Sequence, residues 1–76
     1  MFRLLDTVAL KHDLAELGLR RGDLGAVVEV HQGGTLEVEF VTASGRTQAL
    51  VTLKAEDVRA VGDGDLIAVR EVRRSA

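Results

Sequence analysis

The chain has no cysteine, proline, tryptophan or tyrosine, and only two phenylalanines among its 76 residues. Without cysteine it can form neither disulfide bonds nor thiolate metal sites. Its few aromatic side chains do not supply the stacking platform on which many proteins place single-stranded bases. The core of the protein must therefore be filled mainly by Val, Leu and Ala side chains.

Long apolar runs and an excess of positive charge are also missing. No stretch approaches the roughly 18 consecutive apolar residues of a membrane span, and Asp6 interrupts the N-terminal run that a secretory signal would need. We therefore expect a soluble, cytoplasmic protein with no membrane partner. The net charge of −2 does not favour neutralisation of several phosphates. The hydrophobic fraction of 46% is high for so small a domain, so a homodimer is an open interpretation.

The sequence does contain several short segments in which apolar and polar residues alternate. This period of two is typical of half-buried β-strands. One tight helical turn is expected at residues 55–57. The strands that we predict cover residues 4–10, 24–31, 35–42, 46–53 and 58–61.

Two glycine-containing turns set the predicted register of the central strands. A two-residue turn at Gly33-Gly34 would slip one strand by a residue and turn its apolar side chains outward. A three-residue loop over residues 32–34, with Gly34 left-handed, avoids this slip, and a two-residue loop at Ser44-Gly45 suits the next hairpin. The predicted pairs are Val30–Leu36, Glu29–Glu37, Val28–Val38, Phe40–Ala49, Val38–Val51 and Leu36–Leu53.

This register also divides the strands into two faces. It places Ala26, Val28 and Val30 toward the core. It places Val27, Val41 and Leu50 on the outward side, where the N-terminal segment, residues 66–72 or another copy of the chain could cover them.

The segments outside these strands are less regular. Residues 13–16 form either a loop or a short helical turn that Asp13 caps and Gly18 ends. We assign residues 1–61 to a barrel and 62–72 to an additional C-terminal strand packed on it, with residues 66–72 as the strand itself. A short helix is the alternative for 66–72, because its periodicity is ambiguous. Residues 73–76 are predicted to be a flexible tail.

The stretch from Leu19 to Val30, in which a basic turn with two glycines leads directly into a strand, resembles the opening of many SH3-like barrels. Together with Leu5-Asp6-Thr7-Val8-Ala9-Leu10, Val38-Glu39-Phe40, and Thr52-Leu53 leading into Asp57-Val58-Arg59, it is similar to an uncharacterised family of very short bacterial proteins. The resemblance covers roughly residues 4–61. It implies an all-β fold, a small SH3-like barrel of five or six antiparallel strands with one short helical turn, and it implies no activity.

Residues for catalysis or metal binding do not form a recognisable pattern. The only histidines are His12 and His31, and the only serines, Ser44 and Ser75, fall in a hairpin tip and a tail. No pair of these residues has the spacing of a nucleophile and its base, or of a metal site. We therefore expect no enzyme activity, no cofactor and no metal.

Two charged features remain as candidates for a site. In the predicted register Glu29 lies opposite Glu37, which costs up to about 1 kcal/mol unless other groups, such as Arg46 or Arg70, compensate the charges. The basic turn suits an anion, and RNA-binding modules of translation factors begin in a similar way.

We expect a non-catalytic module that binds a protein of unknown identity. The alternative is an RNA- or DNA-associated module that uses the basic turn and the C-terminal residues Arg70, Arg73 and Arg74. The candidate partner-binding residues are Arg20, Arg21, Asp23, Glu29, Glu37 and Glu39.

Overall fold

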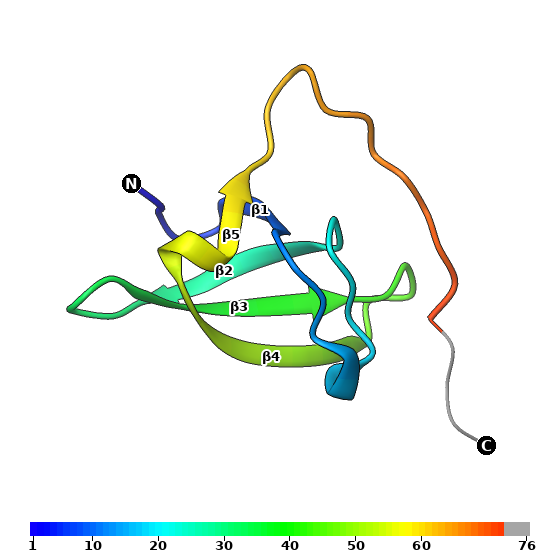
Figure 1. Cartoon of the computed structure of the whole chain (residues 1–76), viewed down its shortest axis with the longest axis horizontal. Helices are drawn as coiled ribbons and strands as arrows, with labels where there is room; N and C mark the ends of the chain where they lie inside the picture. Colours follow the sequence, from blue (N-terminus) through cyan, green and yellow to red (C-terminus); the bar gives the residue numbers. More distant parts are fainter. Residues whose placement is uncertain (73–76) are drawn as a thin grey trace.

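The computed structural model describes residues 1–72 as a small all-β fold with five antiparallel strands in one sheet (Figure 1). The sheet order is β4-β3-β2-β1-β5, so β4 and β5 form the two edges and the barrel is compact but not closed. The prediction of an all-β fold with five antiparallel strands is confirmed. The strands are β1 (Thr7–Leu10), β2 (Leu24–Val30), β3 (Thr35–Val41), β4 (Thr47–Lys54) and β5 (Val58–Ala60).

The core lies between the inward faces of these strands. Alternate residues of β3 are buried and their neighbours are more exposed, as the period of two requires. Since each face of the sheet is defined by this alternation, the residues that point outward from β2, β3 and β4 form a second, solvent-facing surface. The buried core consists of Val8, Leu10, Leu19, Val27, Leu36, Val38, Phe40, Leu53 and Val58.

The predicted register of β2 and β3 is correct at the turn and wrong further along. Val30 pairs with Leu36 and Glu29 with Glu37, as predicted, but Val38 pairs with Val27 instead of Val28. A β-bulge between Val27 and Glu29 adds one residue to β2, which reverses the faces on its far side. Val27 is therefore fully buried and Val28 is exposed, the opposite of the prediction.

The hairpin between β3 and β4 confirms its three predicted apolar pairs, which begin with Phe40 and Ala49. Its turn is nevertheless one residue longer than predicted. The N–H of Thr42 donates to the carbonyl oxygen of Arg46 at 2.9 Å, Gly45 has a φ of 88°, and the register shifts after Phe40. A three-residue turn combined with a bulge thus gives the same pairing as a two-residue turn without one.

Two short 3-10 turns join the strands. The turn η2 (Ala55–Asp57) stands where the sequence predicts it, directly before β5. The turn η1 (Ala15–Leu17) ends at Gly18, whose φ is 72°, as predicted. Its N-cap is Leu14 and not Asp13, because the Asp13 carboxylate accepts a hydrogen bond from the backbone N–H of Arg21 at 2.8 Å instead.

The first strand is shorter than predicted. It begins at Thr7, because the preceding residues form a turn in which the N–H of Asp6 donates to the carbonyl oxygen of Arg3 at 3.1 Å. Leu5 adopts a φ of 70° in this turn, a value that a strand does not use.

The predicted sixth strand is absent from residues 1–72. After a turn at residues 62–65, the chain moves away from the sheet and returns as an extended segment, drawn in orange and red in Figure 1. Alternation leads to a strand only where an unpaired sheet edge lies within hydrogen-bonding distance, and this segment has none. The tail predicted at residues 73–76 lies outside the described residues. None of the helical elements in residues 1–72 has the length and hydrophobicity of a transmembrane helix.

Candidate functional site

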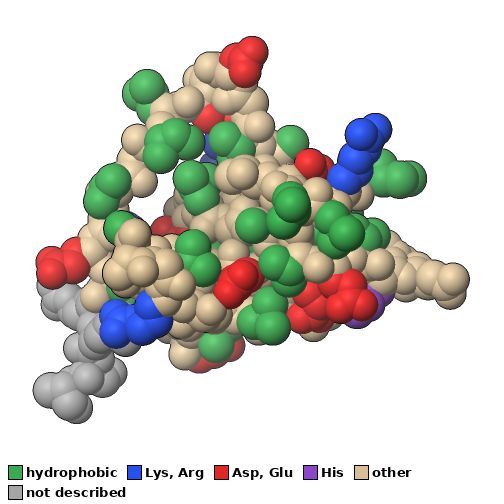
Figure 2. Space-filling view, turned by 180° about the vertical axis from the view of Figure 1, so that it is seen from behind, with side chains coloured by type: hydrophobic (Ala, Val, Ile, Leu, Met, Phe, Trp, Pro, Cys, Tyr) green, Lys and Arg blue, Asp and Glu red, His purple; other side chains and the backbone are tan. Residues whose placement is uncertain are grey.

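Three glutamates gather on the outward surface of β2 and β3. Glu29 and Glu37 lie directly opposite each other, as predicted, and Glu39 follows two residues later on β3. Figure 2 shows acidic side chains on this side of the molecule, beside a histidine and among hydrophobic groups. The structure thus brings together three of the six candidate residues.

Among residues 1–72, hydroxyl groups and one histidine, and not arginines, contact these carboxylates. Thr52 Oγ1 donates to Glu37 Oε1, and Thr47 Oγ1 donates to Glu39 Oε2 at 2.6 Å. The His31 ring lies between the opposed pair, with Nε2 at 3.4 Å from Glu37 Oε1 and Nδ1 at 3.9 Å from Glu29 Oε2. The hydrogen bond from Thr52 is the main reason that the pKa of Glu37 is lowered; partial burial opposes it and His31 adds to it.

Exposed apolar side chains flank the glutamates on the same surface. Leu50 pairs with Glu39 across the ladder and is 60% exposed, and Val41 at the end of β3 is 54% exposed. The prediction that these two point outward is confirmed, whereas Val27, predicted beside them, is buried by the bulge. We call Glu29, Glu37, Glu39, Val41 and Leu50 together the acidic–apolar face.

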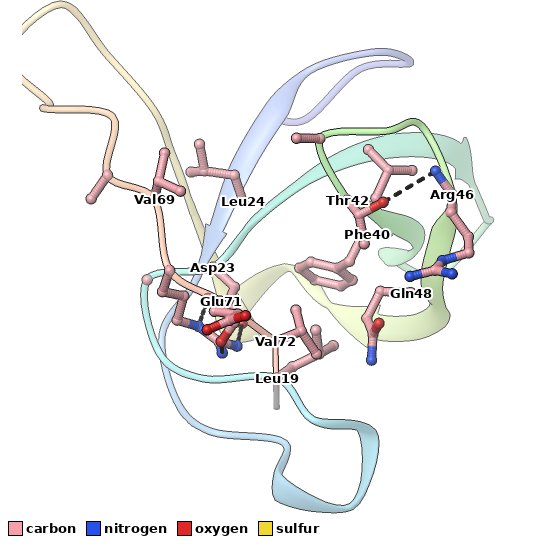
Figure 3. A pocket seen from close by; sticks show the side chains of 15 residues that line it. Leu19, Asp23, Leu24, Phe40, Thr42, Arg46, Gln48, Val69, Glu71 and Val72 are labelled. Atoms are coloured by element: carbon pink, nitrogen blue, oxygen red, sulfur yellow. Dashed lines mark hydrogen bonds and ion pairs between the residues drawn. The ribbon is translucent and has the colours of Figure 1, made fainter. Parts of the chain in front are cut away.

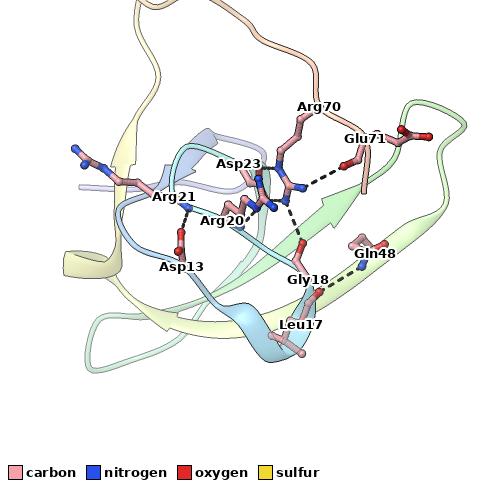
Figure 4. A network of polar contacts seen from close by, with 9 residues as sticks. All are labelled: Asp13, Leu17, Gly18, Arg20, Arg21, Asp23, Gln48, Arg70 and Glu71. Atoms are coloured by element: carbon pink, nitrogen blue, oxygen red, sulfur yellow. Dashed lines mark hydrogen bonds and ion pairs between the residues drawn. The ribbon is translucent and has the colours of Figure 1, made fainter. Parts of the chain in front are cut away.

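The remaining candidates form a separate cluster at the turn before β2, shown in Figure 4. Asp23 closes this turn by accepting the backbone N–H of Arg20 at 2.7 Å. The guanidinium of Arg70 then binds the same carboxylate through Nε, at 2.8 Å, and through Nη2. Arg70 Nη2 also donates to the carbonyl oxygen of Gly18 at 3.0 Å. The side chains of Arg20 and Arg21 are exposed.

The protonation of Asp23 follows from these contacts. Partial burial favours the neutral acid, but the hydrogen bonds from Arg70 and from the backbone of Arg20 outweigh it and lower the pKa of Asp23. Asp23 is therefore a fixed anion within the protein. The sequence places Arg70 among candidate phosphate ligands, whereas the structure shows its guanidinium bound internally. No local pattern could reveal a pair separated by 47 positions.

The two histidines take part in separate polar contacts. His12 Nε2 lies 3.0 Å from Asp57 Oδ1 and connects the end of β1 to η2. This hydrogen bond is the largest cause of a raised pKa for His12. His31 lies at the acidic–apolar face, so the structure does not bring the two rings together.

Comparison with known proteins gives one result. The family model described as domain of unknown function DUF4926 matches residues 4–60. No curated protein and no solved structure gives a match. Because the matched region covers most of the 76 residues, the chain belongs to this family, and the predicted membership of an uncharacterised family is confirmed.

Proposed function

We propose that this member of the DUF4926 family is a small non-catalytic module, built on an SH3-like barrel, that binds another protein through its acidic–apolar face. The family resemblance further leads us to propose a bacterial, cytoplasmic protein. The observation that carries the binding proposal is the composition of this face. Three carboxylates and two exposed aliphatic side chains share it, and among the described residues only His31 forms an ion pair with any of these glutamates.

This composition favours a partner with basic and apolar side chains. Protein interfaces combine an apolar centre with complementary charges at the rim. Leu50 and Val41 supply the apolar area, and the glutamates supply the negative charge. A second copy that presented the same face would bring like charges together, so a different protein is the better fit.

Nucleic acid is the less favoured partner. Arg70 is already bound to Asp23, which leaves Arg20 and Arg21 as the exposed cations of the turn. Affinity for nucleic acid depends on how many phosphates are neutralised, and among the described candidate residues these two arginines would neutralise few.

A capture experiment tests the proposal. Wild-type protein, the Glu29→Gln/Glu37→Gln variant and a Glu16→Gln/Glu56→Gln control of equal net charge would be immobilised and exposed to nuclease-treated extract from the native cells. Glu16 and Glu56 are exposed and lie in the 3-10 turns, away from the face. We expect a specific protein on the wild type and the control that is lost from the face variant.

Two outcomes would reject the proposal. If the face variant is at least as stable as the wild type and captures the same proteins, the glutamates form only a solvated surface. If instead the wild type is retained on heparin at low salt and elutes steeply with added salt, the nucleic-acid function is the correct one.

A further inference from the structure

The extended C-terminal segment, residues 66–72, is attached to the rest of the protein at few points. Its last backbone bond to the sheet precedes it, from the N–H of Val61 to the carbonyl oxygen of Thr7 at 3.3 Å. Leu66 and Val69 are 96% and 95% exposed. Within residues 1–72, the side-chain contacts of Arg70 and Val72 therefore hold this segment in place.

Arg70 is bound by acceptors that the barrel supplies. The Asp23 carboxylate accepts two of its N–H groups and the Gly18 carbonyl accepts a third. Asp23 is oriented by the backbone N–H of Arg20, and Gly18 by the end of η1. Neither constraint involves the C-terminal segment, so residues of the barrel itself orient the acceptors of the guanidinium. A planar, two-pronged arrangement of this kind selects Arg over Lys.

A groove with a partly apolar lining adjoins this site. It has a volume of about 460 Å³ and lies between residues 68–72 and the end of the barrel. Leu19, Leu24 and Phe40 form its floor, and the side chain of Val72 lies beside Leu19 and Phe40 (Figure 3). Arg70 and Val72 thus contact adjoining polar and apolar parts of the barrel and line the groove, with a spacing of two residues as expected for an extended chain.

The barrel residues of this surface lie inside the family match, whereas the segment that contacts them lies outside it. Residues 4–60 match the family, and they include the floor of the groove, Gly18 and Asp23. Arg70 and Val72 lie beyond the match. The surface formed by Gly18, Asp23 and the groove floor thus belongs to the family domain, and the segment that covers it does not.

We propose that this groove is a docking site for an extended segment of another protein, one that presents an arginine to Asp23 and an aliphatic side chain two residues later. In the free protein, residues 70–72 form one wall of this groove, and Arg70 already binds Asp23 and Gly18, so this segment acts as an intramolecular competitor. The site is distinct from the acidic–apolar face and does not depend on it. The Asp23 carboxylate and the Gly18 carbonyl oxygen, which Arg70 now contacts, define this ligand chemistry together with the apolar floor. A second copy of this chain fits less well, because it could offer only its own residues 66–72. The same segment is already tethered within each chain, where its effective concentration is high.

Opening the site in the full chain provides the test. The Arg70→Ala variant removes the competitor's anchor but leaves the acceptors intact. The probe is a synthetic peptide of residues 66–72, Leu-Ile-Ala-Val-Arg-Glu-Val, with both ends blocked. It would be titrated by NMR up to about 2 mM, a concentration comparable with that of a short tether. We expect saturable shifts of the Gly18, Arg20 and Asp23 amides in the variant, with at least about tenfold weaker binding to the wild type.

Two controls test the recognition itself. Replacing the peptide's arginine with alanine, or adding Asp23→Asn to the variant, should weaken binding by about tenfold or more, because each change removes a charge-assisted hydrogen-bond pair. Arg70→Lys keeps the charge but loses the two-pronged geometry. It should admit the peptide with intermediate affinity, so it serves as the test if Arg70→Ala does not fold.

The proposal is overturned if the opened protein shows no shifts at the highest peptide concentration, or if it binds equally well without the Asp23 carboxylate. Size-exclusion chromatography tests whether a second copy of the chain, instead of another protein, binds in the groove. A concentration-dependent wild-type dimer that Arg70→Ala abolishes would assign the groove to a second copy and would also overturn the proposal.

Discussion

Replacing Gly25 with alanine should destabilise the protein because the core has no room for one more methyl group. A Cβ at this position of β2 would lie 2.6 Å from Val38 Cγ1 and 2.9 Å from Phe40 Cε2. Both neighbours are buried, so they cannot move aside freely. Overpacking of this kind costs about 1–3 kcal/mol, whereas the reduced entropy of the unfolded chain returns only about 0.4–1 kcal/mol. We expect a net loss of about 1–2 kcal/mol.

Thermal and urea unfolding would measure this loss. In a domain of this size each kcal/mol lowers the Tm by roughly 4–8 °C. Gly64→Ala is the matched control, because a Cβ there meets no atom within 4 Å. The control should stay within about 0.5 kcal/mol of the wild type. If Gly25→Ala is as stable as the wild type or more so, the close approach of β3 does not require glycine, and the packing argument is refuted.

Two further predictions concern the bulge and a histidine. Val27→Ala should lower the free energy of unfolding by about 1–3 kcal/mol, because Val27 is fully buried, whereas Val28→Ala should change it by less than about 1 kcal/mol; equal losses in urea unfolding would contradict the bulge. Because Asp57 raises the pKa of His12 above its ordinary value of 6.5, the folded protein holds this proton more tightly than the unfolded chain. The Tm advantage of the wild type over His12→Ala should therefore be complete below pH 6.5 and should disappear as the pH rises through the raised pKa. A difference that does not vary with pH would show that the ion pair has no effect on stability.

The sequence predicts most of the sheet and part of the candidate site. Alternation and turn glycines are local signals, and they are sufficient to place the central strands, the 55–57 turn and the opposed pair Glu29–Glu37. These local signals do not show which groups compensate the negative charges of that pair. Thr52 and His31 reach Glu37 from a neighbouring strand and from the turn, and no charge pattern along the chain identifies these neutral or weakly basic groups as its partners.

By itself, the sequence determined an all-β domain with a defined turn order and an acidic outward surface, because side-chain alternation and left-handed glycines act over a few residues. Only the tertiary structure decided which valine of β2 is buried, because an extra residue in one strand becomes visible only against its partner strand. It also decided that residues 66–72 form no strand and that Arg70 binds Asp23. Each of these outcomes depends on which distant groups the folded barrel brings within hydrogen-bonding distance, and that proximity is a property of the assembled fold.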